Sequence, residues 1–268
     1  MKHTITFIGA GTVSNAIIGG LSSGGTSYHL RASDLSHDAR QNLSDRYKVQ
    51  VFANNLDPLP GSDVILCAVK PQDMDAVLAE LQGHIMPDQL LISVAAGTNC
   101  QHINTALGER QAIIRTMPNT PAVIGMGITG MYANAYCTDQ HRWIAEEIFS
   151  AVGEFVWLEE ESQIDTVTAI SGSGPAYFYY LIEALRDSAI DMGLEPGTAS
   201  RLVMKTAVGA AALASRSDLD IRHLREEVTS AGGTTEAALK TMRHRDFKGL
   251  VDEAVRSAEN RSRELAES

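Results

Sequence analysis

The sequence has few cysteines and no pattern of metal ligands. Its three cysteines, Cys67, Cys100 and Cys137, are far apart and odd in number, so they indicate neither a disulfide framework nor a zinc site. The eight histidines include no HxxxH or HExxH pair. Cys67 lies in the apolar run 64–69, where a free cysteine most often packs as a small core residue. We therefore expect no bound metal.

An excess of basic residues and long apolar runs are also lacking. The 22 Lys and Arg are outnumbered by 33 Asp and Glu, for a net charge of -11, which disfavours nucleic acid as a partner. No apolar stretch approaches the ~20 residues of a membrane span. Only two residues separate Met1 from the first apolar run, which leaves no room for a signal peptide. We expect a cytoplasmic protein with no membrane or nucleic-acid partner.

Short apolar runs alternate with helical patterns over residues 1–160. The runs 64–69 and 90–95 do not alternate between apolar and polar residues, which is typical of strands covered on both faces. Strand followed by helix, repeated, indicates βαβ units and a doubly wound parallel sheet. We expect strands at 4–8, 28–33, 64–69, 90–95, 112–116 and 154–158, and helices at 13–22, 38–47, 73–83 and 140–151.

The sequence changes character after about residue 161, where Ala, Leu, Glu and Arg dominate and β-branched clusters become rare. Periodic apolar positions predict an all-helical region. The Ala-rich stretch 207–212 suits either a buried helix within one chain or a close helix–helix contact between two chains. The expected helices cover 177–192, 199–214, 236–242 and 246–265.

The segment 9–14 (GAGTVS) joins the first expected strand to the first helix. Gly9 permits a tight turn, and Gly11 lacks a side chain, so the backbone can approach a pyrophosphate. The helix N-terminus adds free N–H groups and the positive end of its dipole. Ser14 replaces the third glycine of the fingerprint, at a position that governs helix–strand packing. The segment therefore predicts a dinucleotide cofactor.

Asp34 ends the second expected strand, 20 residues after Ser14. An acid at this place accepts hydrogen bonds from the adenosine ribose and repels a 2′-phosphate, which favours NADH over NADPH. Arg31 and Arg40 lie near in sequence and offer an alternative, since either guanidinium suits a phosphate. Asp34 is also suited to cap the following helix. The preference between the two nicotinamide cofactors therefore stays open.

Three further strand ends carry special residues. Lys70 and Pro71 close the run 64–69, small residues fill 93–97 (SVAAG), and 117–121 reads MPNTP. Ligands of open α/β sheets bind at the carboxyl ends of the strands. We expect Lys70 to meet the cofactor and the small residues to let a flat nicotinamide lie against backbone.

The segment 228–236 (VTSAGGTTE) is a polar, glycine-containing loop that enters an expected helix. Several N–H groups at such a helix start have no intrahelical partner, so the loop is suited to hold a carboxylate. A simple capping box explains Thr234 and Thr235 but leaves the consecutive glycines Gly232 and Gly233 unexplained.

Together, the segments 68–71 (AVKP), 117–121 (MPNTP), 171–177 (SGSGPAY) and 229–235 (TSAGGTT) resemble pyrroline-5-carboxylate reductase. The resemblance covers essentially the whole chain, with the motifs in the family's order and spacing. It implies reduction of L-1-pyrroline-5-carboxylate to L-proline with NAD(P)H, the last step of proline biosynthesis. It also implies a Rossmann domain over 1–160, and a helical dimerisation and substrate-binding domain over 161–268. In this family, dimers often assemble into decamers.

The resemblance also implies which residues contact the ligands. It places the pyrophosphate on Gly11, Thr12, Val13 and Ser14, the adenosine near Asp34 and Asn55, the rest of the cofactor along Val69 and Lys70, and the nicotinamide beside Ala96. It assigns the substrate carboxylate and ring nitrogen to a loop supplied by the neighbouring subunit, made of Ser230, Gly232, Gly233, Thr234 and Thr235.

Three positions depart from the family pattern. Thr12 stands where Asn is common and Ser14 where Ala is common, and both keep the turn small. Ala231 replaces the usual proline of the carboxylate loop, which frees φ and makes the loop less pre-organised. We expect this change to affect substrate affinity and not the type of reaction.

A protonated cyclic imine is already electrophilic, so its reduction needs no strong general acid. We expect the Thr235 hydroxyl to bind the ring nitrogen and catalysis to depend largely on positioning. One rival is a hydroxyacid dehydrogenase, but Lys205, Lys240 and His223 lie in no matching motif. A second rival is a dinucleotide sensor without turnover, which has no need of the Gly232-Gly233 loop.

Overall fold

The computed structural model describes residues 3–24, 28–108 and 110–267. The chain forms two compact units. The first consists of Met1–Ser173 together with Ala258–Ser268, and the second of Gly174–Ser257.

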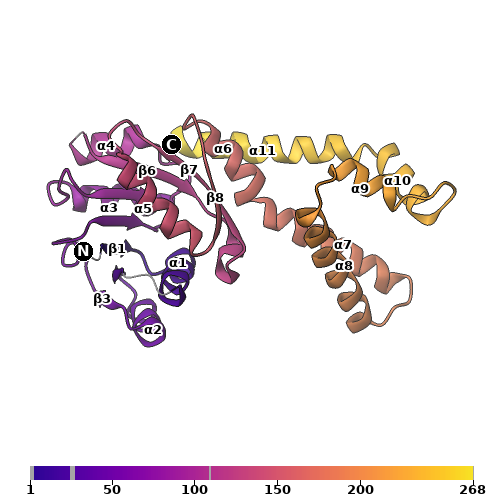
Figure 1. The fold of residues 1–268 in the computed structure, drawn as a ribbon, viewed down its shortest axis with the longest axis horizontal. Helices are drawn as coiled ribbons and strands as arrows, with labels where there is room; N and C mark the ends of the chain where they lie inside the picture. The colour runs from indigo at the N-terminus through magenta and orange to yellow at the C-terminus, as the bar shows by residue number, and fades with distance from the viewer. Residues whose placement is uncertain (1–2, 25–27, 109, 268) are drawn as a thin grey trace. The chain divides into compact units, whose positions relative to one another are not determined.

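The first unit contains an eight-stranded sheet in the order β3-β2-β1-β4-β5-β6-β7-β8 (Figure 1). All neighbouring strands are parallel except β6 and β7. The order 3-2-1-4-5-6 is that of dinucleotide-binding folds, so the predicted doubly wound sheet is confirmed. The strands are β1 (Thr4–Ile8), β2 (His29–Ser33), β3 (Gln50–Phe52), β4 (Val64–Cys67), β5 (Leu90–Ser93), β6 (Ala112–Met117), β7 (Gly127–Ala133) and β8 (Gly153–Trp157).

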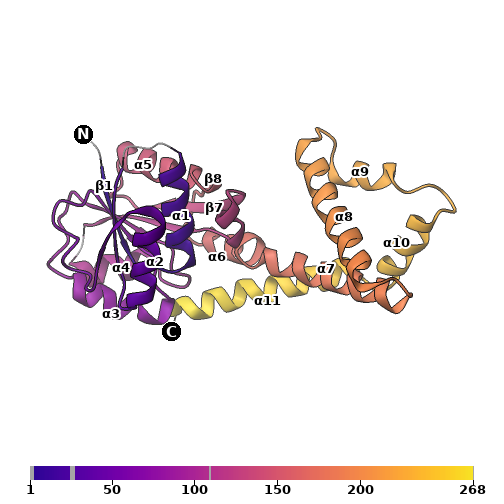
Figure 2. The ribbon, with the colours of Figure 1, turned by 90° about the horizontal axis from the view of Figure 1, so that it is seen from below.

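Helices cover both faces of this sheet (Figure 2). On one face, Ile5 and Phe7 of β1 pack with Ile17, Leu43 and Phe149 from three different helices. On the other face, apolar side chains of β1, β4 and β5 pack against two more helices. The first face is covered by α1 (Thr12–Ser23), α2 (His37–Tyr47) and α5 (Asp139–Ser150), and the second by α3 (Pro71–Leu81) and α4 (Cys100–Leu107).

Every predicted strand is present, but two of them end two residues earlier than expected. The runs 64–69 and 90–95 leave the sheet after Cys67 and Ser93, so their last two residues belong to loops at the sheet edge. The strands β3 and β7 and the helices α4, α6 and α9 were not predicted. The helix α6 (Gln163–Val167) and the π-helix η2 (Thr168–Gly172) complete this part of the first unit before the second begins.

The second unit is helical, as predicted, and has almost no core of its own. Within 174–257, all of which is described, only Gly174 and Ala199 are buried. Large apolar side chains such as Phe178, Tyr180 and Leu213 are more than 60% exposed, which indicates a surface that needs a partner. Its helices are α7 (Gly174–Asp191), α8 (Pro196–Arg216), α9 (Ile221–Glu227), α10 (Thr234–His244) and the first half of α11 (Phe247–Glu267).

Residues 3–24, 28–108 and 110–267 include no helix with the length and apolar character that a membrane span requires.

Candidate cofactor and substrate sites

Four parallel strands of the first unit end at the same edge of the sheet. Ile8 of β1 is in register with Ser33 of β2 and Cys67 of β4, and Cys67 with Ser93 of β5. The chain places β2 on one side of β1 and β4 on the other, so the strand order reverses at β1. Open α/β sheets bind their ligands at this switch point.

The turn after β1 is built around Gly9. Its φ is +97°, and a Cβ there would lie 2.5 Å from the carbonyl oxygen of Ala68. Gly9 N–H donates to Ser33 O at 2.9 Å, so the turn is fixed against both neighbouring strands. Gly11 differs, because a Cβ there would meet nothing within 4 Å. Gly9 therefore serves the fold, whereas Gly11 leaves the backbone open to a ligand.

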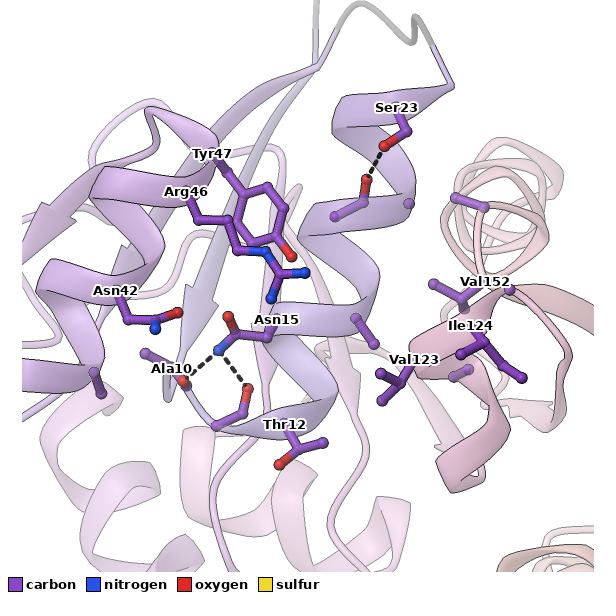
Figure 3. A pocket seen from close by; sticks show the side chains of 18 of the residues that line it. Ala10, Thr12, Asn15, Ser23, Asn42, Arg46, Tyr47, Val123, Ile124 and Val152 are labelled. Atoms are coloured by element: carbon purple, nitrogen blue, oxygen red, sulfur yellow. Dashed lines mark hydrogen bonds between the residues drawn. The ribbon is translucent and has the colours of Figure 1, made fainter.

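Two side chains of α1 hold the carbonyl groups of this turn. Ser14, fully buried, donates from Oγ to Gly9 O at 2.5 Å. Asn15 donates from Nδ2 to Ala10 O at 2.9 Å and to Gly11 O at 3.0 Å (Figure 3). No side chain caps the start of α1, so its first N–H groups remain available for an anion. Sequence reasoning missed Asn15, although an amide four residues after Gly11 is placed to reach back.

Asp34 ties the end of β2 to the same turn. Its Oδ2 accepts from Ala10 N–H and its Oδ1 from Ser36 N–H, both at 2.7 Å. Arg40 donates from Nη1 to the carbonyl oxygen of Asp34 at 2.6 Å, which places a guanidinium at this strand end. Arg31 instead donates to the carbonyls of Pro58 and Pro60. Of the two arginines considered for a phosphate, only Arg40 therefore lies beside Asp34.

The remaining predicted cofactor residues follow β3, β4 and β5. Asn55 accepts from Ser33 Oγ at 2.8 Å, which binds the loop after β3 to β2. Val69 is half-buried, and the exposed Lys70 stands at the N-cap of α3. Ala96 is half-buried in the loop after β5.

A cavity of about 860 Å³ adjoins the dinucleotide turn (Figure 3). It runs along the outer side of α1, with Arg46 and Asn42 of α2 on one side and Val123 of η1 (Thr120–Ile124) on the other. Among the predicted cofactor residues, Gly11 and Thr12 line it. The cavity thus reaches the turn but follows α1 instead of the row of strand ends.

In the second unit, the predicted carboxylate loop lies between α9 and α10. Gly232 adopts φ +72° and Gly233 is the N-cap of α10, with no side-chain cap. The N–H groups of Thr234 and Thr235, in the first turn of the helix, therefore lack intrahelical acceptors. Ser230 is exposed, and its carbonyl accepts from Gly233 N–H at 3.0 Å.

Glu236 was not predicted to act in this loop. Its Oε2 accepts from Gly232 N–H at 2.7 Å, which fixes the loop directly after Ala231. Glu236 thus helps to order the loop. The same carboxylate also occupies one of the N–H donors of the loop.

Thiol chemistry and metal binding have little support from the described part of the chain. Burial raises the pKa of the Cys67 thiol to about 12 and that of Cys137 to about 11. Burial, followed by the nearby Glu161 carboxylate, also raises the pKa of Cys100. Among residues 3–24, 28–108 and 110–267, no three His, Cys, Asp or Glu side chains gather closely enough for a metal.

Two family models match the chain. Residues 161–265 match pyrroline-5-carboxylate reductase dimerisation, and residues 4–97 match NADP oxidoreductase coenzyme F420-dependent. The chain is 43% identical to the pyrroline-5-carboxylate reductase of Pseudomonas aeruginosa over 264 residues, which cover 98% of this chain and 97% of that protein.

Solved structures of pyrroline-5-carboxylate reductases are also similar to this chain. The pyrroline-5-carboxylate reductase of Coxiella burnetii matches with a TM-score of 0.92 and 34% identity over 100% of both chains. The Plasmodium falciparum pyrroline carboxylate reductase, solved with NADP bound, matches with a TM-score of 0.88 and 27% identity over 98% of both chains. The chain belongs to the pyrroline-5-carboxylate reductase family, whose members are NAD(P)H-dependent oxidoreductases.

Proposed function

We propose that this protein reduces L-1-pyrroline-5-carboxylate to L-proline with NAD(P)H. The observation that carries the proposal is the loop before α10. It combines Gly232 at φ +72°, an uncapped helix start and the hydroxyls of Thr234 and Thr235. A small carboxylate is the ligand that such a group of N–H donors suits best. The identity to the Pseudomonas aeruginosa reductase over nearly the whole chain supports the substrate.

The residues at the switch point fit a dinucleotide. Gly11 leaves backbone open, and the first N–H groups of α1, at Thr12 and Val13, suit a pyrophosphate. Asp34 lies at the end of β2, where an adenosine ribose is held in this fold. The proposed cofactor residues are Gly9, Gly11, Thr12, Val13, Ser14, Asp34, Asn55, Val69, Lys70 and Ala96.

The proposed substrate residues are Ser230, Gly232, Gly233, Thr234 and Thr235. Backbone N–H groups of the loop bind the carboxylate, while the Thr235 hydroxyl binds the ring nitrogen. These contacts fix the imine carbon in one orientation. Orientation of this kind can account for several kcal/mol of the barrier.

A dihydronicotinamide held at the switch point would supply a hydride to the imine carbon. The C=N π electrons become the lone pair of the amine nitrogen, which already carries the proton of the iminium. The hydride and the proton already on the iminium nitrogen are the two hydrogens added across the C=N bond, so one NAD(P)H is oxidised for each L-proline formed. This protein therefore needs no strong acid in the site, and Thr235 acts by holding the nitrogen.

The proposal includes a cytoplasmic homodimer formed through the helical region 161–268, with residues 1–160 holding the cofactor. The exposed apolar side chains of α7 and α8 support this surface, because a unit with two buried residues lacks a core. In the dimer, the loop of one subunit serves the cofactor of the other. Light scattering of the purified protein distinguishes this dimer from a decamer built of such dimers.

Thr235→Ala tests the proposed role of the hydroxyl, with Thr241→Ala as its control on the same helix. Thr241 donates only to the carbonyl of Ala237, within α10, at 3.3 Å. We expect Thr235→Ala to lower kcat/KM for the imine by about 10-fold, the effect of losing one hydrogen bond of about 1.4 kcal/mol, and Thr241→Ala to leave it unchanged. An unchanged kcat/KM in Thr235→Ala removes Thr235 from the mechanism.

A further inference from the structure

A buried serine anchors the end of α11 within the first unit. Ser262 is 3% exposed, and its Oγ donates to Asp165 Oδ1 of α6 at 2.7 Å. Asp165 is itself only 8% exposed. One turn earlier, Glu259 accepts from Thr166 Oγ1 at 2.6 Å. The last turns of α11 are therefore fixed to α6 by two hydrogen bonds, one of them buried.

Asp165 also belongs to a network of hydrogen bonds and ion pairs that reaches the start of α4. Arg115 of β6 is 3% exposed and pairs with Glu161 at 3.2 Å and with Asp165 at 3.9 Å. Glu161 Oε1 also accepts from Cys100 N–H at 2.6 Å. Cys100 is the first residue of α4 and directly follows the loop after β5. The network thus holds the far end of that loop.

The end of α11 also lies directly on the middle of this loop. Gly97 has φ +76°, and a Cβ there would lie 2.8 Å from the carbonyl oxygen of Leu265 and 2.9 Å from its carbonyl carbon. Backbone therefore meets backbone, with no room for a side chain. Residues 94–99 are held by Leu265 above Gly97 and by Glu161 at Cys100.

We propose that Ser262 is a positioning residue for hydride transfer, which acts by seating the last turn of α11 on the loop 94–99. The inference rests on the proposed function, in which Ala96 of this loop lies beside the nicotinamide. Ser262 touches neither substrate nor cofactor. It determines how firmly the loop presents Ala96.

Loss of the Ser262 hydroxyl leaves the buried Asp165 carboxylate without its serine donor. Arg115 is a poor replacement, because its Nη2 has no hydrogen-bond partner and lies 3.9 Å from Asp165. The end of α11 is then free to lift from Gly97, and the loop loses its support. A misplacement of about 1 Å at a reacting centre can cost up to about 100-fold in rate, so we expect kcat to fall by about 10-fold.

The experiment compares Ser262→Ala with Ser257→Ala in the full-length protein. Ser257 lies on the same helix, and its Oγ donates only to the carbonyl of Glu253 at 2.8 Å. For each variant we would measure kcat with NADPH and pyrroline-5-carboxylate, the stoichiometry of NADPH binding, and Tm. The proposal predicts a kcat about 10-fold lower in Ser262→Ala at full NADPH stoichiometry.

Two results would overturn the proposal. One is a kcat in Ser262→Ala within about twofold of that in Ser257→Ala, whatever happens to Tm. The other is a kcat that falls only in proportion to the NADPH-binding stoichiometry, because that pattern reports lost folded protein. Failure of the proposed function is seen separately, as a wild-type protein that does not oxidise NADPH with this imine. In that case the fluorescence of bound NADPH is the readout, and identical spectra in both variants overturn the proposal.

Discussion

Asp34→Ser separates the structural role of this carboxylate from its role in cofactor choice. The substitution removes two acceptors, those of Ala10 N–H and Ser36 N–H, each at 2.7 Å. Ala10 is 3% exposed, so its N–H loses its partner in a place with little access to water. Leaving a buried donor unpaired costs about 1–3 kcal/mol. The exposed Ser36 N–H can donate to water instead, so the loss of its acceptor adds little to this cost.

This cost corresponds to a Tm lower by about 2–12 °C, since about 1 kcal/mol shifts Tm by about 2–4 °C in a unit of this size. Thermal unfolding without cofactor measures it. The control is Asp45→Ser, which removes the same charge from the exposed face of α2 and loses only a bond from the Gln41 side chain. We expect the control to change Tm by less than about 2 °C.

The same variant tests cofactor choice through kcat/KM for NADPH relative to NADH. Asp34→Ser removes a negative charge beside the expected 2′ position, while Arg40 stays at the same strand end. We expect the ratio to rise by about 10-fold, equivalent to about 1.4 kcal/mol. An unchanged ratio would refute the placement of Asp34 at the ribose, and an unchanged Tm would refute its role in holding the turn.

Three other predictions follow from the site. Gly9→Ala should lower Tm and abolish cofactor binding, because Gly9 has a φ of +97° and a Cβ there would meet the backbone of Ala68. Gly11→Ala should keep the wild-type Tm and weaken only NADPH binding, which titration of NADPH measures. Glu236→Gln should keep an acceptor for Gly232 N–H while removing the negative charge near the substrate carboxylate. We therefore expect a lower KM for the imine at unchanged kcat, and a raised KM would contradict this. The cysteine thiols should not react with a disulfide reagent at pH 8 in the native protein and should react fully in guanidinium, because burial raises their pKa values to about 12 for Cys67 and about 11 for Cys137.

The parallel sheet could be predicted because its strands carry their signal locally. All five residues of β1 are buried, and a glycine turn follows the strand directly. The strand β7 gave no such signal, since Gly127 and Gly130 weaken a strand pattern. The structure shows why Gly130 is a glycine, because a Cβ there would lie 2.7 Å from the Val167 side chain. Such close packing depends on a helix more than 30 residues away, which no local pattern reveals.

The helix α4 is a different case, because its signals were present. Asn99 caps its start by accepting from His102 N–H at 2.7 Å, and Gly108 ends it at φ +95°. Its apolar positions, Cys100, Ile103, Ala106 and Leu107, cover only two turns, which is too short a stretch for periodicity to stand out in the sequence. Short helices of this kind are found from their caps more readily than from periodicity.

In the candidate site, too, some features could be predicted from the sequence and others could not. The glycine turn and the loop 230–235 are contiguous segments whose chemistry can be read from residue types, and the sequence indicated both. Asp34 was placed correctly at the end of its strand, but its bond to Ala10 N–H required the register of β1 and β2. The network from Cys100 through Arg115 to Ser262 joins residues up to 162 positions apart. No spacing of residues in the sequence predicts this network.

The most direct test of the central claim follows the absorbance of NADPH and of NADH after L-1-pyrroline-5-carboxylate is added to the purified protein. The proposal predicts oxidation of the cofactor with formation of one L-proline per cofactor oxidised, and a raised KM for NADPH in Gly11→Ala. No oxidation with this imine, together with turnover of a keto or hydroxy acid pair, would identify a different dehydrogenase. Binding of NAD(P)H without any turnover would contradict the claim in favour of a dinucleotide sensor.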